Sequence, residues 1–218
     1  MIASADIPSR LALEPTVFVV DDDVSVRESL ELLLRHAGWR PQLFASAQAF
    51  LANPRVIAPR CLVLDITLPD LNGLDLQRRI AIDQPYMPII FITGHGDVPM
   101  SVQAMKCGAF EFLTKPFAEE VLLNAIRSAI DHSQRALREE AELQSLRERY
   151  VALTPREREV MQLVVSGRLN KQVGGELGIS VITVKAHRGS LMRKMTAESL
   201  ADLVKIDARL RLTPAPQG

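Results

Sequence analysis

The sequence has few cysteines, no membrane-length apolar run and no recognisable export signal, and each absence excludes a class of protein. Its 218 residues contain two cysteines, Cys61 and Cys107, both in apolar surroundings, so we expect buried, reduced thiols and no disulfide framework. No apolar run approaches the roughly 18–20 residues that a membrane-spanning helix needs, so no membrane partner is expected. Residues 1–15 lack the basic-then-apolar layout of a signal peptide, so we expect a flexible N-terminus in a cytoplasmic protein.

The sequence also lacks net charge, because 26 Lys and Arg side chains balance 26 Asp and Glu side chains. The balance hides a division: residues 1–131 carry 11 basic and 16 acidic side chains, whereas residues 151–218 carry 11 and 6. Only the C-terminal part therefore attracts a polyanion, although many domains of such charge bind no nucleic acid. A length of 218 residues exceeds the roughly 100–150 residues of one domain, so we expect two domains.

Short apolar runs alternate with helical patterns over the first 130 residues, which is typical of an α/β domain with a parallel sheet. The strands are continuous apolar segments, so helices are expected on both faces of the sheet. Right-handed crossovers then bring the carboxyl ends of all strands to one edge, where such sheets bind ligands. The predicted strands are 16–20, 42–44, 61–64, 88–93 and 110–113, and the predicted helices are 25–36, 47–52, 74–82 and 98–107, with a long helix from about residue 119.

Polar residues stand at the carboxyl ends of four of these strands: Asp21, Asp22, Asp65, Thr93 and Lys115. We therefore expect them to converge in one crevice, although each alone is more often a helix cap or a solvated side chain. Three carboxylates without His or Cys nearby favour Mg²⁺, which prefers hard oxygen ligands. A carboxylate beside this ion can attack phosphorus, and the phosphoryl oxygens then need an ammonium and a hydroxyl group as partners. Asp65, Lys115 and Thr93 match these roles.

The motifs around these residues resemble the receiver domain of bacterial response regulators over about residues 17–130. The resemblance implies a flavodoxin-like domain at 16–131, with a five-stranded, doubly wound parallel sheet of strand order 2-1-3-4-5. Two further segments resemble the FixJ subgroup closely. The receiver motifs are Val20-Asp21-Asp22-Asp23, Leu64-Asp65-Ile66-Thr67-Leu68-Pro69-Asp70, Ile92-Thr93-Gly94 and Lys115-Pro116-Phe117, and the FixJ segments are Gly94-His95-Gly96-Asp97-Val98-Pro99-Met100 and Met105-Lys106-Cys107-Gly108-Ala109.

By this resemblance, Asp65 is the phosphoacceptor, and a sensor histidine kinase is the partner that donates the phosphoryl group. The family implies that Asp22 binds Mg²⁺ directly and that Asp21 binds it through water. Asp65 and the carbonyl group of Thr67 would complete the metal site. The protein is then expected to be a regulator and not an enzyme, since it would promote only its own phosphorylation and dephosphorylation.

The resemblance also implies a switch that phosphorylation operates. Thr93 and Lys115 would bind the phosphoryl group, and the ring of Phe112 would turn inward as Thr93 moves toward the phosphate. A cis peptide bond is implied between Lys115 and Pro116. The surface that includes Val102 and Lys106 would then form a symmetric homodimer.

A rival enzyme interpretation starts from Asp21-Asp22-Asp23-Val24-Ser25, which loosely resembles the nucleophile loop of haloacid-dehalogenase-type phosphatases. That family needs Thr or Val where Ser25 stands. It also needs a second acidic pair after its later lysine, whereas Lys115 is followed by Pro116-Phe117. A phosphatase of this kind would turn over many substrate molecules with Asp21 as nucleophile.

The C-terminal part of the chain shows helical periodicity and no predicted strand. A helical linker is expected over 132–150, and a solvated helix fits better than a coiled coil because Ser133 and Gln144 interrupt its apolar seam. We expect an all-α, four-helix domain at 151–212 and a disordered tail at 213–218.

A helix-turn-helix outline lies within this domain. Thr154, Pro155 and Glu157 form a capping box with proline at the first helical position. A short helix at 170–177, a turn that contains Gly178 and a longer helix at 181–195 follow, an arrangement that many helical bundles also show.

The helix at 181–195 separates an apolar face from an outward face of small and cationic residues. Such a face suits close approach to the major groove of DNA, although an ordinary solvated helix face is the alternative. Gly189 favours the close approach, because glycine inside a helix costs about 1 kcal/mol relative to alanine. The expected DNA-binding residues are Thr183, Lys185, Ala186, Arg188, Gly189, Arg193 and Lys194.

Motifs in this part resemble the LuxR-type helix-turn-helix of NarL and FixJ proteins over about residues 153–206. The resemblance implies double-stranded promoter DNA as a partner and RNA polymerase as a further partner, whereas a pure signalling adaptor would bind no specific DNA. Gly174 departs from the family, which usually has alanine there, and its pairing with Gly175 weakens the short helix. The motifs are Leu153-Thr154-Pro155-Arg156-Glu157, Asn170-Lys171-Gln172-Val173, Leu177-Gly178-Ile179-Ser180 and Thr183-Val184-Lys185-Ala186-His187-Arg188.

Overall fold

The computed structural model describes residues 14–54, 57–94 and 98–211. Contacts between residues divide the chain into two compact units, Met1–Arg138 and Glu139–Gly218. The predicted flexible N-terminus at 1–15 lies outside the described residues except for its last two, and the predicted tail at 213–218 lies outside them entirely. No helix in the described ranges is long and apolar enough to cross a membrane.

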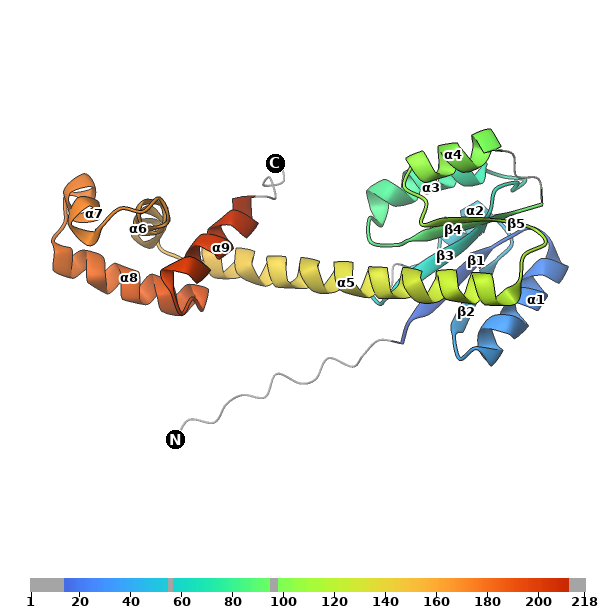
Figure 1. Cartoon of the computed structure of the whole chain (residues 1–218), viewed down its shortest axis with the longest axis horizontal. Helices are drawn as coiled ribbons and strands as arrows, with labels where there is room; N and C mark the ends of the chain where they lie inside the picture. Colours follow the sequence, from blue (N-terminus) through green and yellow to red (C-terminus); the bar gives the residue numbers. More distant parts are fainter. Residues whose placement is uncertain (1–13, 55–56, 95–97, 212–218) are drawn as a thin grey trace. The chain divides into compact units, whose positions relative to one another are not determined.

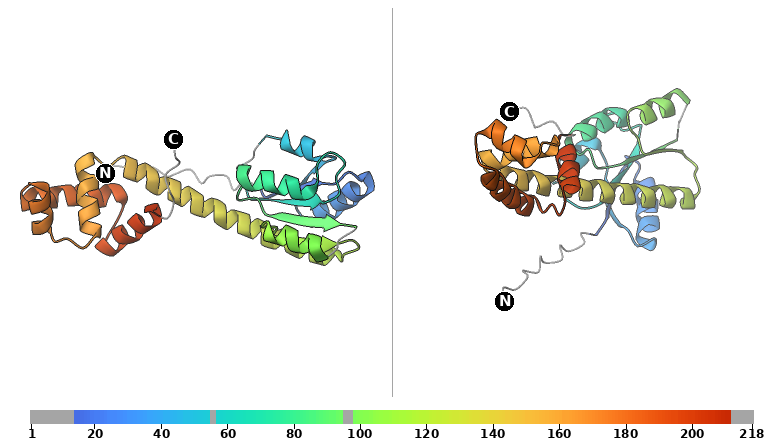
Figure 2. Two further views of the ribbon diagram at one scale, coloured as in Figure 1. Left: turned by 90° about the horizontal axis from the view of Figure 1, so that it is seen from above. Right: turned by 60° about the vertical axis from the view of Figure 1, so that its left-hand side comes forward.

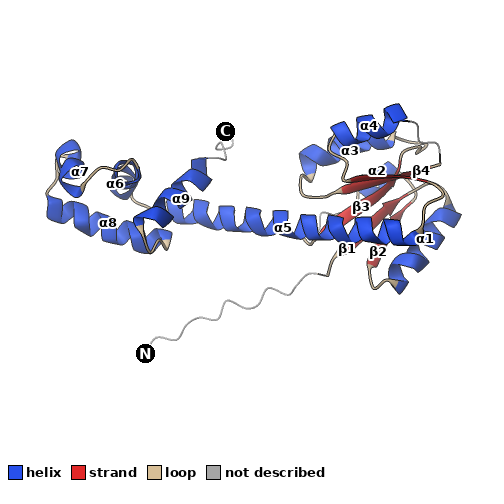
Figure 3. Ribbon diagram, in the orientation of Figure 1, coloured by secondary structure: helices blue, strands red, loops and turns tan. Residues whose placement is uncertain are grey.

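The described part of the first unit is built on a parallel sheet whose strand order is β2-β1-β3-β4-β5 (Figures 1 and 3). This order confirms the one that the receiver resemblance implies. Strand β2 begins two residues earlier than predicted and includes Pro41. Because β2 is an edge strand, a residue without an N–H donor is tolerated there. The strands are β1 (Thr16–Val20), β2 (Arg40–Phe44), β3 (Arg60–Asp65), β4 (Ile89–Thr93) and β5 (Glu111–Thr114).

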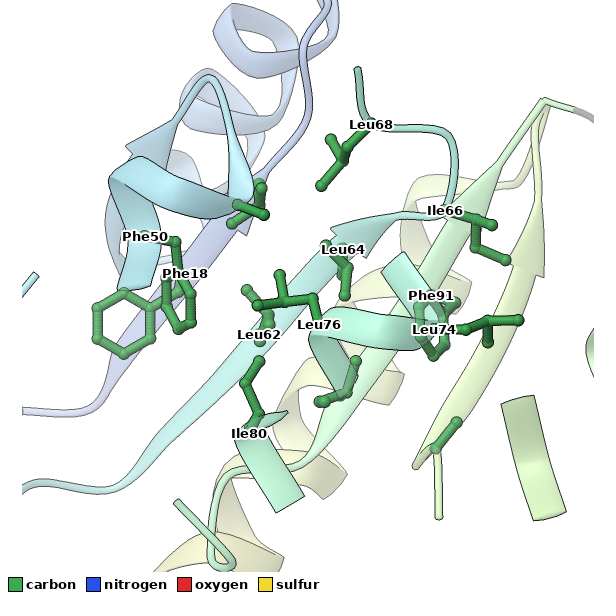
Figure 4. Packing of buried hydrophobic residues seen from close by; sticks show 14 of the residues in the cluster. Phe18, Phe50, Leu62, Leu64, Ile66, Leu68, Leu74, Leu76, Ile80 and Phe91 are labelled. Atoms are coloured by element: carbon green, nitrogen blue, oxygen red, sulfur yellow. The ribbon is translucent and has the colours of Figure 1, made fainter. Parts of the chain in front are cut away.

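Helices cover both faces of the sheet, as its continuous apolar strands predict (Figure 2). Helices α1 (Val24–His36) and α5 (Glu119–Val151) pack on one face, and α2 (Ala47–Leu51), α3 (Gly73–Asp83) and α4 (Val98–Lys106) pack on the other. On the second face, Phe18, Leu62 and Phe91 of the sheet join a buried cluster with Phe50 of α2 and Ile80 of α3 (Figure 4).

The register of the strands aligns their carboxyl ends. Val20 pairs with Leu64, Asp65 pairs with Ile92, and Thr93 pairs with Thr114. The residue that follows β1 and the last residues of β3 and β4 therefore stand at neighbouring positions along one edge. Hydrogen bonding of the backbone thus places the polar residues of the sequence motifs side by side.

Helix α5 is continuous from Glu119 to Val151, which confirms the predicted long helix. Ser133, whose polarity interrupts the apolar seam, is fully buried. Its hydroxyl group accepts a hydrogen bond from the N–H of Arg60 at 3.2 Å and donates one to the carbonyl oxygen of Tyr86 at 2.8 Å. This polar contact holds α5 against the amino-terminal end of β3. The first unit extends to Arg138, and the linker boundary at 132–150 stays a prediction.

Both cysteines are free thiols, but their environments differ. Cys61 is fully buried in β3, and this burial raises the pKa of its thiol. Cys107, just after α4, is only half-buried. The expectation of two buried thiols is therefore wrong for Cys107, because the apolar residues around it in sequence do not enclose it in space.

The second unit contains the end of α5 followed by four helices, with no strand between residues 139 and 211. Val184, Leu191 and Met195 are fully buried in its core, as the apolar face predicts. The capping box is confirmed: the Thr154 hydroxyl accepts from the N–H of Glu157, and the Glu157 carboxylate accepts from the N–H of Thr154. The helices are α6 (Pro155–Val165), α7 (Asn170–Leu177), α8 (Val181–Met195) and α9 (Leu200–Arg211).

The two adjacent glycines of α7 differ in how closely other residues pack against them. A Cβ atom at Gly174 would lie 2.8 Å from the carbonyl oxygen of Ile179, so close packing between α7 and the turn requires glycine there. A Cβ atom at Gly175 would meet nothing within 4 Å. Only Gly175 therefore weakens the helix without a packing reason.

Gly175→Ala is expected to raise the free energy of unfolding of the second unit by about 1 kcal/mol, because alanine favours the helix and nothing opposes its side chain. Gly174→Ala is expected to lower it, because the Ile179 carbonyl group must move. Urea unfolding followed by circular dichroism measures both changes. An equal gain from the two substitutions would contradict the close approach at Gly174.

Candidate functional site

Lys115 lies between two buried carboxylates at the carboxyl edge of the sheet. Its Nζ atom is 2.8 Å from Oδ2 of Asp21 and 3.5 Å from Oδ1 of Asp65. Asp21 and Asp65 are only 1% and 7% exposed. Two carboxylates thus share one ammonium group in a place largely removed from water, and the site carries excess negative charge. The convergence of these three residues confirms what their positions at the strand ends predict.

The environment opposes full ionisation of Asp65. Burial raises the pKa of the Asp65 carboxyl group; Lys115 lowers it, Asp21 raises it, and the N–H of Thr67 lowers it. The net pKa lies above the ordinary value for aspartate. A further cation beside Asp65 would therefore stabilise its carboxylate form, which is the form that can act as a nucleophile.

Local hydrogen bonds hold the two carboxylates in place. Asp65 Oδ2 accepts a hydrogen bond from the N–H of Thr67 at 3.1 Å, and Asp21 Oδ1 accepts one from the N–H of Asp23 at 2.9 Å. The guanidinium group of Arg27 donates to the carbonyl oxygen of Asp21 at 2.7 Å. Arg27 was not among the predicted site residues; its place one helical turn into α1, facing the end of β1, is the signal that identifies it.

The oxygen donors at this edge fit Mg²⁺. Among the described residues, no group of three or more His, Cys, Asp or Glu side chains is arranged to hold a metal ion. Mg²⁺ does not need such a group, because it commonly binds one or two carboxylates and keeps several water molecules. Asp21 and Asp65 supply two buried carboxylates, and Asp22 and Thr67 are exposed beside them. The ligand set of Asp21, Asp22, Asp65 and Thr67 stays a prediction.

The predicted switch residues lie on the two strands beyond Asp65. Thr93 is 1% exposed at the end of β4, and its carbonyl oxygen accepts a hydrogen bond from the N–H of Lys115 at 2.8 Å. Phe112 on β5 is half-buried, with its ring 6.3 Å from the ring of Phe91. The implied cis peptide bond between Lys115 and Pro116 is confirmed.

The predicted dimerisation residues lie on the outer side of α4. Val102 is 44% exposed and Lys106 is exposed, so both side chains are accessible in this unit. Two further apolar side chains of this helix are exposed: Val98 is 76% exposed and Met105 is 47% exposed. Residues 95–97 of the FixJ-like segment lie outside the described residues.

Two carboxylates of the acidic loop after β1 are engaged in contacts within the first unit. Asp23 is the N-cap of α1, and its carboxylate accepts a hydrogen bond from the N–H of Ser25 at 2.8 Å. The carboxylate of Asp23 therefore serves to start α1. Asp21, the nucleophile in the phosphatase interpretation, is held by Lys115.

The predicted DNA-binding residues on α8 fall into two groups. Lys185, Ala186, Gly189 and Arg193 are exposed on the outward face. The other three contact residues of their own unit: the Thr183 hydroxyl group lies 2.8 Å from that of Ser180, the Arg188 guanidinium group donates to Asn170 Oδ1 at 3.0 Å, and Lys194 Nζ lies 2.7 Å from Glu157 Oε2.

Two protein families match this chain in separate segments. Residues 17–127 match the family described as response regulator receiver domain, and residues 151–206 match the family of bacterial regulatory proteins of the luxR type. The chain belongs to the response regulator family. Its parallel sheet with the flanking helices and its C-terminal helical domain correspond to these two segments, so this response regulator combines a receiver domain with a luxR-type DNA-binding domain.

Similar proteins extend over almost the whole response regulator. It is 45% identical to the response regulator protein TmoT of Ectopseudomonas mendocina, over 91% of this chain and 90% of that protein. It is 42% identical to the transcriptional regulatory protein FixJ of Bradyrhizobium diazoefficiens, over 88% of this chain and 94% of that protein. The solved structure of the response regulator StyR has a TM-score of 0.81 with 45% identity, over 90% of this chain and 99% of that one.

The ion pair between Lys194 and Glu157 is expected to make the stability of the luxR-type domain depend on pH. Burial raises the pKa of Glu157, but hydrogen bonds from Lys194, Ser190 and Thr154 outweigh it and lower the pKa from 4.5 to about 2. The folded domain therefore favours the carboxylate form more than the unfolded chain does. The stabilisation is fully present above pH 4.5 and is lost as the pH falls toward about 2.

Urea unfolding of wild type and Glu157→Gln at several pH values measures this effect. Wild type should be the more stable protein near neutral pH, by about 1–2 kcal/mol, because water screens the partly exposed ammonium group of Lys194. The difference should shrink as the pH falls from 4.5 toward 2. A difference that is constant across this range would show that the charge of Glu157 does not carry the stabilisation.

Proposed function

We propose that Asp65 accepts a phosphoryl group from a sensor histidine kinase and that the resulting acyl phosphate switches dimerisation and promoter binding. The observation that carries this proposal is the position of Asp65, a buried carboxylate that is 3.5 Å from the ammonium group of Lys115. One oxygen of Asp65 attacks phosphorus, and the bond between the phosphoryl group and the kinase histidine breaks. Asp65 is the acceptor, since Asp21 is already held by Lys115 at 2.8 Å.

The side chains around Asp65 supply partners for the new phosphoryl oxygens. Lys115 needs only a short movement to contact them, and the Thr93 hydroxyl group at the end of β4 provides a donor. As Thr93 moves toward the phosphate, the ring of Phe112, which lies 6.3 Å from the ring of Phe91, turns inward. Asp21, Asp22, Asp65 and the Thr67 carbonyl group would hold Mg²⁺, which when bound neutralises developing charge on the phosphoryl oxygens.

The movement of Thr93 and Phe112 is proposed to change the surface of α4. Its exposed residues Val102 and Lys106 then form a symmetric homodimer interface. Two luxR-type domains would reach half-sites about one helical turn, ~10 base pairs, apart on promoter DNA. In this proposal the protein acts in the cytoplasm, recruits or blocks RNA polymerase, and promotes no reaction beyond its own phosphorylation and dephosphorylation.

The residues that contact DNA are proposed to be those on the outward side of α8. Lys185 and Arg193 contact phosphates or base edges, whereas Ala186 and Gly189 allow the helix axis to approach the bases. Thr183 and Arg188 lie at the rim and contact phosphates after small rearrangements. Lys194 holds α8 against α6 through Glu157, so its DNA contact is proposed to be secondary.

Asp65→Asn tests the phosphorylation switch, because it keeps the shape of the side chain and removes the nucleophilic carboxylate. With acetyl phosphate and Mg²⁺, wild type should dimerise and bind promoter DNA about 5- to 150-fold more tightly, the usual range of allosteric coupling. Asp65→Asn should remain a weakly binding monomer. Light scattering and fluorescence anisotropy measure the two properties.

Val102→Asp serves as a matched control for the dimerisation step. It should accept the phosphoryl group at the wild-type rate, because Val102 lies away from Asp65 on the exposed side of α4. It should nevertheless stay monomeric. An equal response to the phosphodonor in wild type and Asp65→Asn would contradict the proposal and reopen an unphosphorylated mode of regulation.

Gly189→Ala tests the close approach to DNA. A Cβ atom at Gly189 would meet nothing within 4 Å in its own domain, so the substitution should stabilise α8 by about 1 kcal/mol. It should at the same time weaken promoter binding, because the added methyl group separates α8 from the bases. Gly175→Ala is the matched control, with the same gain in stability and unchanged binding. Unchanged binding by Gly189→Ala would contradict the close approach.

A further inference from the structure

Ile182 is an apolar side chain at the second position of α8, and it is 80% exposed. It is the most exposed large aliphatic residue of the described part of α8. Single exposed aliphatic residues are common on protein surfaces and need no explanation by themselves. The position of Ile182 distinguishes it, because the first turn of a recognition helix is the part that contacts base edges.

The surroundings of Ile182 form an apolar strip bordered by cations. Ala186 lies one turn further along the same face, and Gly189 follows it with open space above its backbone. Lys185 and Arg193 are exposed at the border. Arg188 and Lys194, the other cations of α8, bond to Asn170 and Glu157 within the unit. The centre of the face therefore offers aliphatic groups, while its border offers positive charge to the phosphates.

We propose that Ile182, together with Ala186, reads the C5 methyl group of thymine in the major groove of the target DNA. This inference rests on the proposed function, in which α8 enters that groove. An isoleucine pressed against a polar base edge would remove water from an acceptor or donor without replacing its hydrogen bond, which is unfavourable. Thymine alone among the four bases presents a methyl group there, so contact with Ile182 is favourable only at a thymine.

The inference makes Ile182 a specificity-determining residue of each half-site. The DNA sites that the protein binds most tightly would have one thymine beside Ile182 in each half-site. A G·C pair at the same position would weaken binding. Hydrogen-bond readout by Lys185 or Arg193 would instead favour guanine, whose N7 and O6 atoms both accept. The two modes of readout predict different bases, so they can be separated.

Replacement of thymine by deoxyuridine provides the test, because it deletes the C5 methyl group and keeps every hydrogen-bonding atom. The preferred site is first selected from random duplexes with full-length wild type in the presence of acetyl phosphate and Mg²⁺. Each thymine of the selected half-site is then replaced in turn, and Kd is measured by fluorescence anisotropy for wild type, Ile182→Ala and Val151→Ala. Val151 is also a 70% exposed aliphatic residue of the second unit, but it lies outside α8.

We expect one thymine in each half-site whose replacement weakens wild-type binding about fourfold, the effect of one buried methyl group. Val151→Ala should keep this sensitivity, and Ile182→Ala should bind less tightly and lose it. Circular dichroism should give the same fold for all three proteins, since both substituted side chains are exposed.

Three results would overturn the inference while the proposed function stands. These are a selected half-site with no thymine, a Kd that no deoxyuridine changes, and an Ile182→Ala protein with wild-type sensitivity to deoxyuridine. If phosphorylated wild type selects no DNA sequence at all, the proposed function fails and the inference fails with it.

Discussion

The ammonium group of Lys115, held between Asp21 at 2.8 Å and Asp65 at 3.5 Å, is the interaction on which the first unit's chemistry depends. Without it, two carboxylates would be buried with no compensating charge. One of them would then take up a proton, and a protonated carboxyl group is no longer a nucleophile. With it, the site is stable yet still carries excess negative charge. This excess of negative charge favours a cation such as Mg²⁺ beside the carboxylates. The anionic oxygens of a phosphoryl group would in turn need the ammonium group of Lys115 and the hydroxyl group of Thr93 as partners.

A second ion pair, between the exposed Lys194 and the buried Glu157, orders the DNA-binding unit. Lys194 on α8 bonds to Glu157, whose carboxylate also caps the start of α6. The orientation of α8 is therefore tied to the start of α6, which the capping box fixes. This contact directs one cation of α8 inward and leaves an outward face of small and aliphatic residues bordered by Lys185 and Arg193. The proposed readout of thymine by Ile182 follows from this distribution of charge.

The sequence predicts the strands and the converging residues well, because each strand is a continuous apolar run that ends in a polar residue. It does not predict the role of Ser133, since a hydroxyl group that interrupts an apolar seam suggests a solvated linker until Arg60 and Tyr86 are seen to bond to it. The pairing of Lys194 with Glu157 likewise depends on how α6 and α8 pack, which no local pattern records. Gly174 and Gly175 look alike in sequence, and only the carbonyl group of Ile179 at 2.8 Å separates their roles.

Asp65, and not its neighbour Asp21, is proposed to carry the phosphoryl group. The most direct measurement is to treat the phosphorylated protein with borohydride, which reduces an aspartyl phosphate to homoserine, and to locate the changed residue by peptide mass spectrometry. We expect homoserine at position 65 alone, because Lys115 holds Asp21 in a short ion pair. Homoserine at position 21 would contradict it and would favour the phosphatase-like chemistry that the acidic loop after β1 first suggests.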